Sequence, residues 1–283
     1  MLKPFFQHFS APGLVCAHRG ARSIAPENTS LAMVKAQACE ADLWETDVQL
    51  TADGVAVLFH DDTLVRTTDI LDRAAFSGKA GLRLTEFSWA ELAALDAGSW
   101  FIHTDPYGTI QSGEVPQEAL PLIAQQRILR LEEALRYCRQ HVFPVNLELK
   151  DQRGTAADGR IVATVLDLIR QTGTEELALI SSFNHDYLRQ IRQQAPELAI
   201  AALVEGAHPP ELVNYLRTLG CDAYHPDQRL IDADFVRQLS AAGMPVNPWT
   251  VNDEAQALEL LDAGAFFICT DWPQRLRKAR HSA

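Results

Sequence analysis

Acidic and basic residues collect at the ends of predicted strands in the first part of the chain. His18 and Arg19 follow a short apolar run that is typical of a buried strand, and Gly20 then lets the backbone turn without a Cβ clash. Glu45 and Asp47 are two residues apart on the next predicted strand, so their side chains share one face. Two carboxylates side by side repel each other unless a cation joins them. The pattern therefore predicts a site of concentrated charge.

Two later stretches add to this predicted site. A turn at Asp53-Gly54 leads into an apolar run that ends at His60. Asn146, Glu148 and Lys150 alternate with apolar residues, so they share one face of a further strand. A carboxylate and an ammonium group would then point together toward the same end of a sheet.

Three carboxylates, from Glu45, Asp47 and Glu148, make a ligand set of oxygen atoms only. Such a set suits a hard divalent cation, either Mg²⁺ or Ca²⁺, better than a soft metal. The alternative is that the three acids are separate and form salt bridges or face solvent. Sequence does not choose between Mg²⁺ and Ca²⁺.

Several short motifs occur in a fixed order at close spacing, and together they resemble the glycerophosphodiester phosphodiesterase family of the bacterial cytosolic type. The motifs are His18-Arg19-Gly20, Pro26-Glu27-Asn28-Thr29, Glu45-Thr46-Asp47, Asp53-Gly54, His60-Asp61, Glu148-Leu149-Lys150 and Trp249-Thr250-Val251-Asn252. The resemblance extends over nearly the whole chain, apart from residues 62–127. It implies a metal-dependent hydrolase that splits glycerophosphodiesters into glycerol 3-phosphate and an alcohol.

The resemblance implies a role for each charged residue. His18 and His60 match the family's catalytic pair, and histidine can both accept and donate a proton near neutral pH. Which histidine is the acid and which the base stays open, as does attack by water or by the neighbouring glycerol hydroxyl. Arg19 and Lys150 would bind phosphate oxygens beside the cation.

Four further residues have predicted supporting roles. Glu27 and Asn28 are expected to support the phosphate or metal site, and Asn28 is equally suited to cap the following helix. Phe183 and Trp249 would form an apolar wall against the glycerol carbons, with a place in the protein core as the equal alternative.

These residues can form one site only in a fold that brings several strand ends close together. The pattern in the second half of the chain predicts such a fold. Strands and helices alternate from residue 131 onward, which is typical of a parallel α/β sheet. The predicted helices are 28–39, 131–140, 159–171, 186–194, 210–219, 232–242 and 253–263, and the later strands are 144–150, 177–183, 198–204, 223–226, 245–251 and 266–271. No Gly-x-Gly-x-x-Gly follows the first strand, which argues against a doubly wound sheet. We therefore expect one (β/α)₈ TIM-barrel domain over residues 1–283, whose chemistry lies at the carboxyl ends of the strands.

Residues 62–127 differ from the rest of the chain, because turns are frequent and a helix at 88–95 is the only clear element. We interpret this segment as an insertion over the barrel mouth. Its aromatic residues would pack it down or line a substrate cleft; they are Trp89, Trp100, Phe101 and Tyr107.

Composition limits the function classes. Of the 283 residues, 47% are hydrophobic and 22% charged, as in a soluble globular protein, and the net charge of −12 argues against a nucleic-acid binder. Five scattered cysteines predict reduced thiols, and from the residues given we expect neither a signal peptide nor a segment inserted stably into a membrane. We expect a cytoplasmic enzyme of undetermined oligomeric state with a small-molecule substrate. The rival functions are cleavage of lysophospholipid-like diesters and a non-catalytic barrel that binds phosphodiesters.

Overall fold

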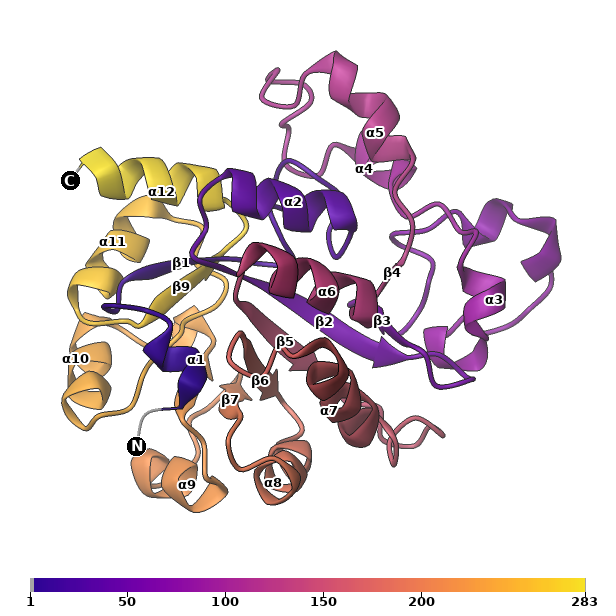
Figure 1. The fold of residues 1–283 in the computed structure, drawn as a ribbon. Helices are drawn as coiled ribbons and strands as arrows, with labels where there is room; N and C mark the ends of the chain where they lie inside the picture. The colour runs from indigo at the N-terminus through magenta and orange to yellow at the C-terminus, as the bar shows by residue number, and fades with distance from the viewer. Residues whose placement is uncertain (1–2, 283) are drawn as a thin grey trace.

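The computed structural model of the chain describes residues 3–282. Among these residues, seven parallel strands lie side by side around the centre of the fold (Figure 1). Their order is β9, β1, β2, β5, β6, β7 and β8. The bounds are β1 Leu14–Ala17, β2 Leu43–Leu50, β5 Val145–Leu149, β6 Ala178–Ser182, β7 Ala199–Val204, β8 Ala223–Pro226 and β9 Phe267–Thr270.

An eighth segment closes the barrel between β8 and β9. The predicted strand over 245–251 is only partly formed: its pairing with the β8 side consists of two isolated parallel bridges, Tyr224 with Val246 and Asp227 with Trp249. On the other side, the backbone N–H of Cys269 donates to the Pro248 carbonyl at 3.0 Å. Pro245 and Pro248 have no N–H to donate, which explains why a continuous ladder does not form here.

Helices surround this ring of strands (Figure 1). They are α1 Pro4–Gln7, α2 Ser30–Ala38, α6 Leu131–His141, α7 Ile161–Thr172, α8 His185–Gln194, α9 Leu212–Leu219, α10 Ala233–Ala241, α11 Glu254–Asp262 and α12 Pro273–Ser282. The seven predicted helices are confirmed to within two residues at each end. Side-chain caps help to start four of them. In α10 and α11, for example, Asp232 accepts from the Phe235 N–H and Asp253 from the Gln256 N–H, both at 2.8 Å.

The strands alternate between an inner and an outer face. Outward residues such as Trp44 and Val48 pack against the helices, whereas Leu43 lies in the cluster inside the barrel. The next inward positions along β2 are Glu45 and Asp47, so the barrel interior changes from apolar to polar toward the carboxyl ends of the strands. TIM-barrel interiors are usually filled by bulky apolar side chains, so this change marks the end that carries chemistry.

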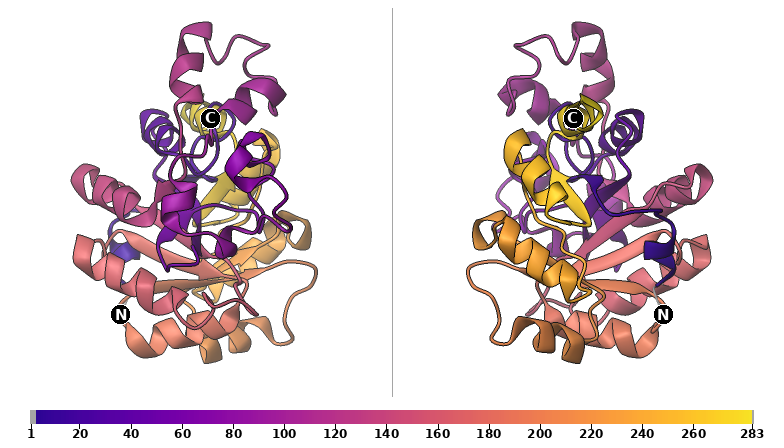
Figure 2. Two further views of the ribbon diagram at one scale, coloured as in Figure 1. Left: turned by 90° about the vertical axis from the view of Figure 1, so that its right-hand side faces the viewer. Right: turned by 90° about the vertical axis from the view of Figure 1, so that its left-hand side faces the viewer.

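The insertion begins after β3 (Ala56–Leu58), which is antiparallel to β2, and ends at β4 (Leu129–Arg130), which pairs with β3. The helix predicted at 88–95 is present as the shorter α3, but the expectation that it is the only clear element was wrong, because the segment holds several short helical pieces whose shortness hides their period. They are η1 Ile70–Asp72, η2 Ala74–Phe76, η3 Leu84–Glu86, α3 Trp89–Leu92, α4 Ser99–Thr104, η4 Gln117–Ala119 and α5 Leu120–Ala124. In the left view of Figure 2 the purple part of this segment faces the viewer, and its magenta part, with α4 and α5, forms the top of the molecule.

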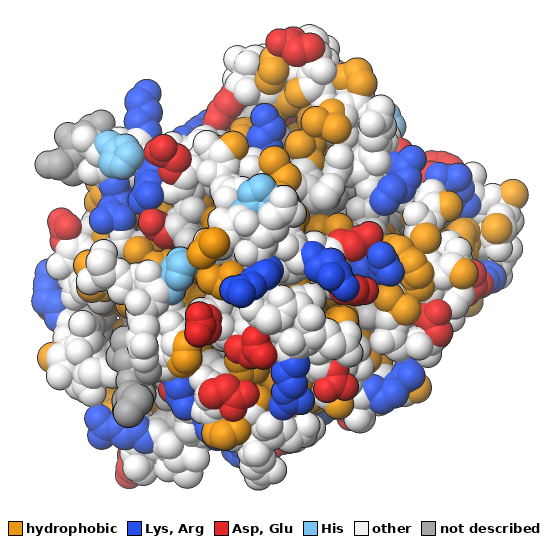
Figure 3. All heavy atoms as spheres, in the orientation of Figure 1, with side chains coloured by type: hydrophobic (Ala, Val, Ile, Leu, Met, Phe, Trp, Pro, Cys, Tyr) orange, Lys and Arg blue, Asp and Glu red, His pale blue; other side chains and the backbone are white. Residues whose placement is uncertain are grey.

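Acidic and basic side chains are interspersed on the face drawn in Figure 3, and no large area of one sign is visible there. Within the described part of the chain, no helix combines the length and the apolar character needed to cross a membrane.

The turn after His18 and Arg19 requires a glycine. Gly20 has a φ of +81°, and a Cβ at this position would lie 2.6 Å from the backbone carbon of Ala32 in α2. Gly108 in the insertion has a φ of +65° but open space around its Cα.

We predict that Gly20→Ala lowers the free energy of unfolding by more than about 2 kcal/mol, because a backbone clash is added to an unfavourable φ. The matched variant Gly108→Ala carries only the φ penalty, about 1 kcal/mol. Urea denaturation of both variants measures the difference. Equal losses would contradict the close approach of the turn to α2.

Candidate active site

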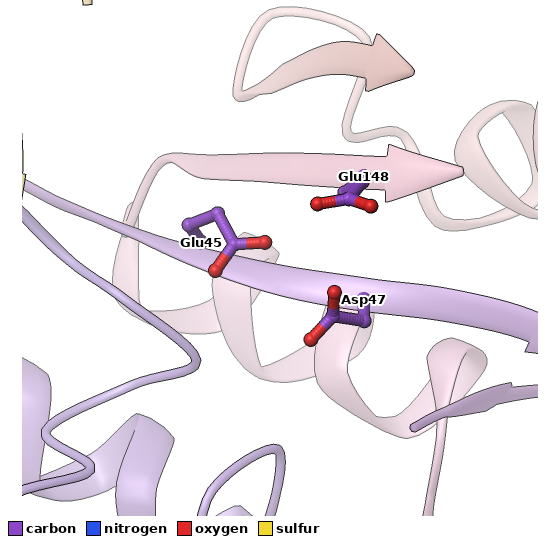
Figure 4. A group of neighbouring side chains, drawn as sticks. All are labelled: Glu45, Asp47 and Glu148. Carbon is purple, nitrogen blue, oxygen red and sulfur yellow. The ribbon is translucent and has the colours of Figure 1, made fainter. Parts of the chain in front are cut away.

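Three carboxylates, two buried and one half-buried, converge at the carboxyl end of two neighbouring strands (Figure 4). Glu45 and Asp47 point inward from β2, and Glu148 points toward them from β5, where it is the register partner of Asp47. One oxygen from each carboxylate lies within 4.8 Å of the others. The structure thus brings together the three acids that sequence selected.

Two cationic side chains lie directly against this cluster. The backbone N–H of Arg19 donates to Glu45 Oε2 at 2.9 Å, and Arg19 Nε is 3.2 Å from Asp47 Oδ2. Lys150 Nζ is 2.7 Å from Glu148 Oε1 and 3.6 Å from Asp47 Oδ1. The cluster therefore contains three carboxylates but only two cationic side chains, so one negative charge among these five residues is not balanced.

Protonation in the cluster reflects this imbalance. Burial, together with the charges of Asp47 and Glu148, raises the pKa of Glu45 well above its usual value. Burial alone would also raise the pKa of Asp47. The positive charges of Arg19 and Lys150 outweigh this effect and hold the pKa of Asp47 well below its usual range.

The donor set fits a hard divalent cation. Glu45 Oε1 is buried and has no hydrogen-bond partner among the described residues. A buried carboxylate oxygen without a partner is costly, and a cation shared by the three acids would satisfy it while offsetting their repulsion.

Asn28 supports this cluster and is not a helix cap. Its Nδ2 donates to Asp47 Oδ2 at 2.8 Å, and its Oδ1 accepts from Thr46 Oγ1 at 2.7 Å. Thr29 is the residue that caps α2, because its hydroxyl oxygen accepts from the Ala32 N–H. The capping alternative for Asn28 is therefore wrong, and its side chain instead fixes the orientation of Asp47.

His18 is held by an acid from the last strand of the barrel. Its Nδ1 donates to Asp271 Oδ1 at 2.7 Å, and Asn252 Nδ2 donates to the other Asp271 oxygen at 2.8 Å. Burial and the nearby Arg19 charge lower the pKa of His18 to about 4, although Asp271 acts in the opposite direction. His18 is therefore neutral at pH 7. Its other ring nitrogen, Nε2, lies 3.9 Å from Glu45 Oε2.

His60 has a similar arrangement. Its Nδ1 donates to Asp61 Oδ1 at 2.6 Å. The loop that carries it is pinned by Gln49 of β2, whose Nε2 lies 2.9 to 3.2 Å from three successive carbonyl oxygens, those of Phe59, His60 and Asp61. Both histidines thus have their Nδ1 atoms bound to a carboxylate.

Glu27 joins three arginines behind the cluster. It accepts from Arg19 Nη1 at 2.9 Å, Arg22 Nη2 at 2.8 Å and Arg66 Nη2 at 2.7 Å. Burial acts to raise its pKa, but Arg19, Arg22 and Arg66 lower the pKa of Glu27 to about 2. Glu27 is therefore ionised and fixes the guanidinium groups around it.

An open cleft of about 430 Å³ connects these groups to solvent. Phe183, just after β6, and Trp249 form one of its walls, with ring centroids 5.4 Å apart in an edge-to-face arrangement. The other lining residues are His18, Arg19, His60, Asp62, Glu148, Lys150, Asp151, Glu205 and Thr250. The structure therefore places both predicted aromatic residues, both histidines and both predicted cationic residues on one cleft.

Sequence reasoning gave no role to several residues that hold this site together. Asp271 stands at the end of the last predicted strand, and Asp61 directly follows His60, so position could have suggested both. Gln49 continues the inward face of the strand that carries Glu45 and Asp47. Arg66 gave no signal, because it lies in a segment without a regular period.

The comparisons with known proteins agree with this geometry. Residues 18–275 match the family model described as the glycerophosphoryl diester phosphodiesterase family. A glycerophosphodiester phosphodiesterase from Caldanaerobacter subterraneus subsp. tengcongensis is 33% identical over 266 residues, which are 93% of this chain and 96% of that protein. A mouse protein named glycerophosphoinositol inositolphosphodiesterase is 42% identical over 95% of this chain but only 48% of its own length.

Solved structures show the same fold. A phosphodiesterase from Oleispira antarctica, in complex with the product sn-glycerol-3-phosphate, superposes with a TM-score of 0.79 at 33% identity, covering 95% of this chain and 96% of that one. The TIM-barrel prediction is confirmed by this likeness. The chain belongs to the glycerophosphoryl diester phosphodiesterase family and is a phosphoric diester hydrolase.

Proposed function

We propose that this protein is a metal-dependent glycerophosphodiester phosphodiesterase that uses two histidines as general acid and base. It would hydrolyse a glycerophosphodiester to glycerol 3-phosphate and an alcohol. The observation that carries the proposal is the shared cleft: His18 and His60 both line it, each with Nδ1 bound to a carboxylate, beside the cluster of three acids. The product bound to the Oleispira antarctica relative supports the same reaction.

Glu45, Asp47 and Glu148 would hold the cation, and oxygen ligands of this kind suit Mg²⁺ or Ca²⁺. A divalent ion bound there would neutralise charge on a phosphoryl oxygen and make the phosphorus more open to attack. Arg19 and Lys150 would bind further phosphate oxygens, since both line the cleft and already lie beside the acids.

The hydrogen bonds to Nδ1 suggest how the histidines divide the work. His18 is neutral at pH 7, so its Nε2 can accept a proton from the attacking hydroxyl. His60, protonated on both ring nitrogens before the step, would then donate its Nε2 proton to the oxygen of the departing alcohol as the phosphorus–oxygen bond breaks, and would keep the Nδ1 proton that Asp61 holds. Phe183 and Trp249 would pack against the glycerol carbons, which their position on the cleft wall supports.

We also propose that residues 62–127 cover one side of the barrel mouth. Support comes from Asp62, which lines the cleft, and from Arg66, which reaches Glu27 beneath it. The cytoplasmic location expected from the reduced cysteines stays a prediction.

The cleft favours a small polar diester over the rival substrate. Phe183 and Trp249 are its only large apolar lining residues in the described chain, whereas Asp62, Asp151 and Glu205 also line it. An acyl chain of a lysophospholipid would lie against these acids. A purely binding role is disfavoured because both histidines and all three acids are present.

The direct test is hydrolysis of glycerophosphocholine by the purified protein, followed by ³¹P NMR. We expect glycerol 3-phosphate to form, to stop in EDTA and to return with Mg²⁺ or Ca²⁺, because the acids need a bound cation to engage the phosphate. Phosphocholine as the product would show that the other ester bond is cleaved, and a cyclic glycerophosphate would show attack by the glycerol hydroxyl. Folded protein that releases no product with any metal would overturn the proposal.

The roles of the histidines can be separated with an activated substrate. We predict that His18→Ala and His60→Ala each lower turnover of glycerophosphocholine by about 10²- to 10⁴-fold, the usual contribution of a general acid or base. With a p-nitrophenyl phosphodiester, whose leaving group needs no proton, His60→Ala should recover most of its activity and His18→Ala should not.

The exposed His103 gives a control, and His103→Ala should behave as the unaltered enzyme. Near-normal turnover of glycerophosphocholine in either of the other two variants would remove that histidine from the mechanism. Recovery by His18→Ala instead of His60→Ala would exchange their roles.

A further inference from the structure

We propose that Arg66, in the insertion, is a positioning residue for His60, and that it acts through Asp61. The inference rests on the proposed function, because it concerns the histidine that would protonate the leaving alcohol. Arg66 does not line the cleft, so it would act without touching the substrate.

The first part of the argument is the contact between Arg66 and Asp61. Arg66 Nε lies 2.6 Å from Asp61 Oδ2 and its Nη2 lies 2.9 Å from Asp61 Oδ1, so the guanidinium group binds both carboxylate oxygens. Asp61 Oδ1 also accepts from His60 Nδ1 at 2.6 Å. A planar two-point contact of this kind fixes the plane of the carboxylate, and with it the direction in which the histidine ring is held.

The second part is the anchor on the opposite side of the same guanidinium group. Arg66 Nη2 is 2.7 Å from Glu27 Oε1, and its Nη1 is 3.1 Å from Glu27 Oε2. The Glu27 side chain is only 3% exposed and also binds Arg19, so it is a fixed point within the site. Arg66 therefore connects the loop of His60 to the residues around Arg19.

Exposure explains why His60 needs this support. The side chains of His60 and Asp61 are 32% and 24% exposed, whereas those of His18 and Asp271 are 13% and 10% exposed. Asp271 is further held by Asn252, while Asp61 depends on Arg66 for its second contact. Without Arg66 the Asp61 carboxylate could turn toward water, and the ring of His60 would lose the acceptor that keeps the Nδ1 proton in place.

This arrangement has a chemical consequence. A carboxylate that accepts from Nδ1–H requires neutral His60 to carry its lone pair on Nε2, the only other ring nitrogen. Proton transfer at the cleft then always uses the same atom in the same orientation. A residue that secures this hydrogen bond contributes to turnover more than to substrate binding.

The ordinary alternative is that Arg66 forms a surface ion pair with little effect, and the chain offers a matched control for it. Arg73, also in the insertion, has the same 2.6 Å distance from Nε to an aspartate oxygen, here Asp69 Oδ2, and the same side-chain exposure of 41%. The two arginines differ in that Arg66 also reaches Glu27 and in that its aspartate holds His60.

We predict that Arg66→Gln lowers kcat for glycerophosphocholine by about 10- to 100-fold, the range seen when the partner of a functional histidine is lost, with a smaller change in KM. Arg73→Gln should stay within about twofold of the unaltered enzyme, as expected for an exposed ion pair. Arg66→Lys should recover little, because an ammonium group cannot bind two carboxylates as a planar fork. Equal kcat values for Arg66→Gln and Arg73→Gln would overturn the proposal.

A second measurement does not depend on activity and so separates this inference from the proposed function. Nitrogen-15 NMR of the histidine rings reports which nitrogen of His60 carries the proton. Among neutral His60 rings, observed at a pH high enough to deprotonate the imidazolium, we expect the Nδ1–H form to predominate in the unaltered protein and in Arg73→Gln, and a mixture of both forms in folded Arg66→Gln. An unchanged His60 spectrum in Arg66→Gln would refute the positioning role, even if the unaltered protein cleaved no glycerophosphodiester.

Discussion

The repulsion among three closely spaced carboxylates governs how this site is built. Glu45, Asp47 and Glu148 present oxygens within 4.8 Å of one another at the end of the barrel, where water does little to screen them. Arg19 and Lys150 offset part of this charge. Burial and the negative charges of Asp47 and Glu148 raise the pKa of Glu45. A bound divalent cation would offset this repulsion.

A second group of ionic contacts surrounds this centre and holds its outer parts in place. Glu27 binds arginines from two separate regions of the chain, and Asp271 and Asp61 each hold one histidine by Nδ1. The barrel supplies the deeper histidine and the insertion supports the more exposed one. We propose that the insertion covers one side of the barrel mouth and also takes part in catalysis through Arg66.

Sequence predicted much of this arrangement because the barrel repeats a simple pattern. Alternation along β2 placed Glu45 and Asp47 on the inner face, and the helices around the barrel followed from their period. The segment over 245–251 was harder, since Pro248 interrupts the ladder that a strand pattern implies. The role of Asn28 was left open because a cap and a buried amide look alike in sequence.

Contacts across long sequence separations could not be predicted. Asp271 meets His18 across most of the chain, and a pattern of local residues carries no information about which strand end faces which. Arg66 lies in short turns without a period, so its approach to Glu27 depends on how the insertion packs. Such contacts follow from closure of the barrel and become visible only in three dimensions.

The central claim is that the three acids bind a cation that engages the substrate phosphate. The most direct measurement is a crystal structure with Mn²⁺, a hard divalent ion with strong anomalous scattering, and sn-glycerol 3-phosphate. The account predicts an anomalous peak within ligand distance of Glu45, Asp47 and Glu148, and the phosphate in the cleft that Arg19 lines. A phosphate bound in the cleft with no anomalous peak at these acids would contradict it.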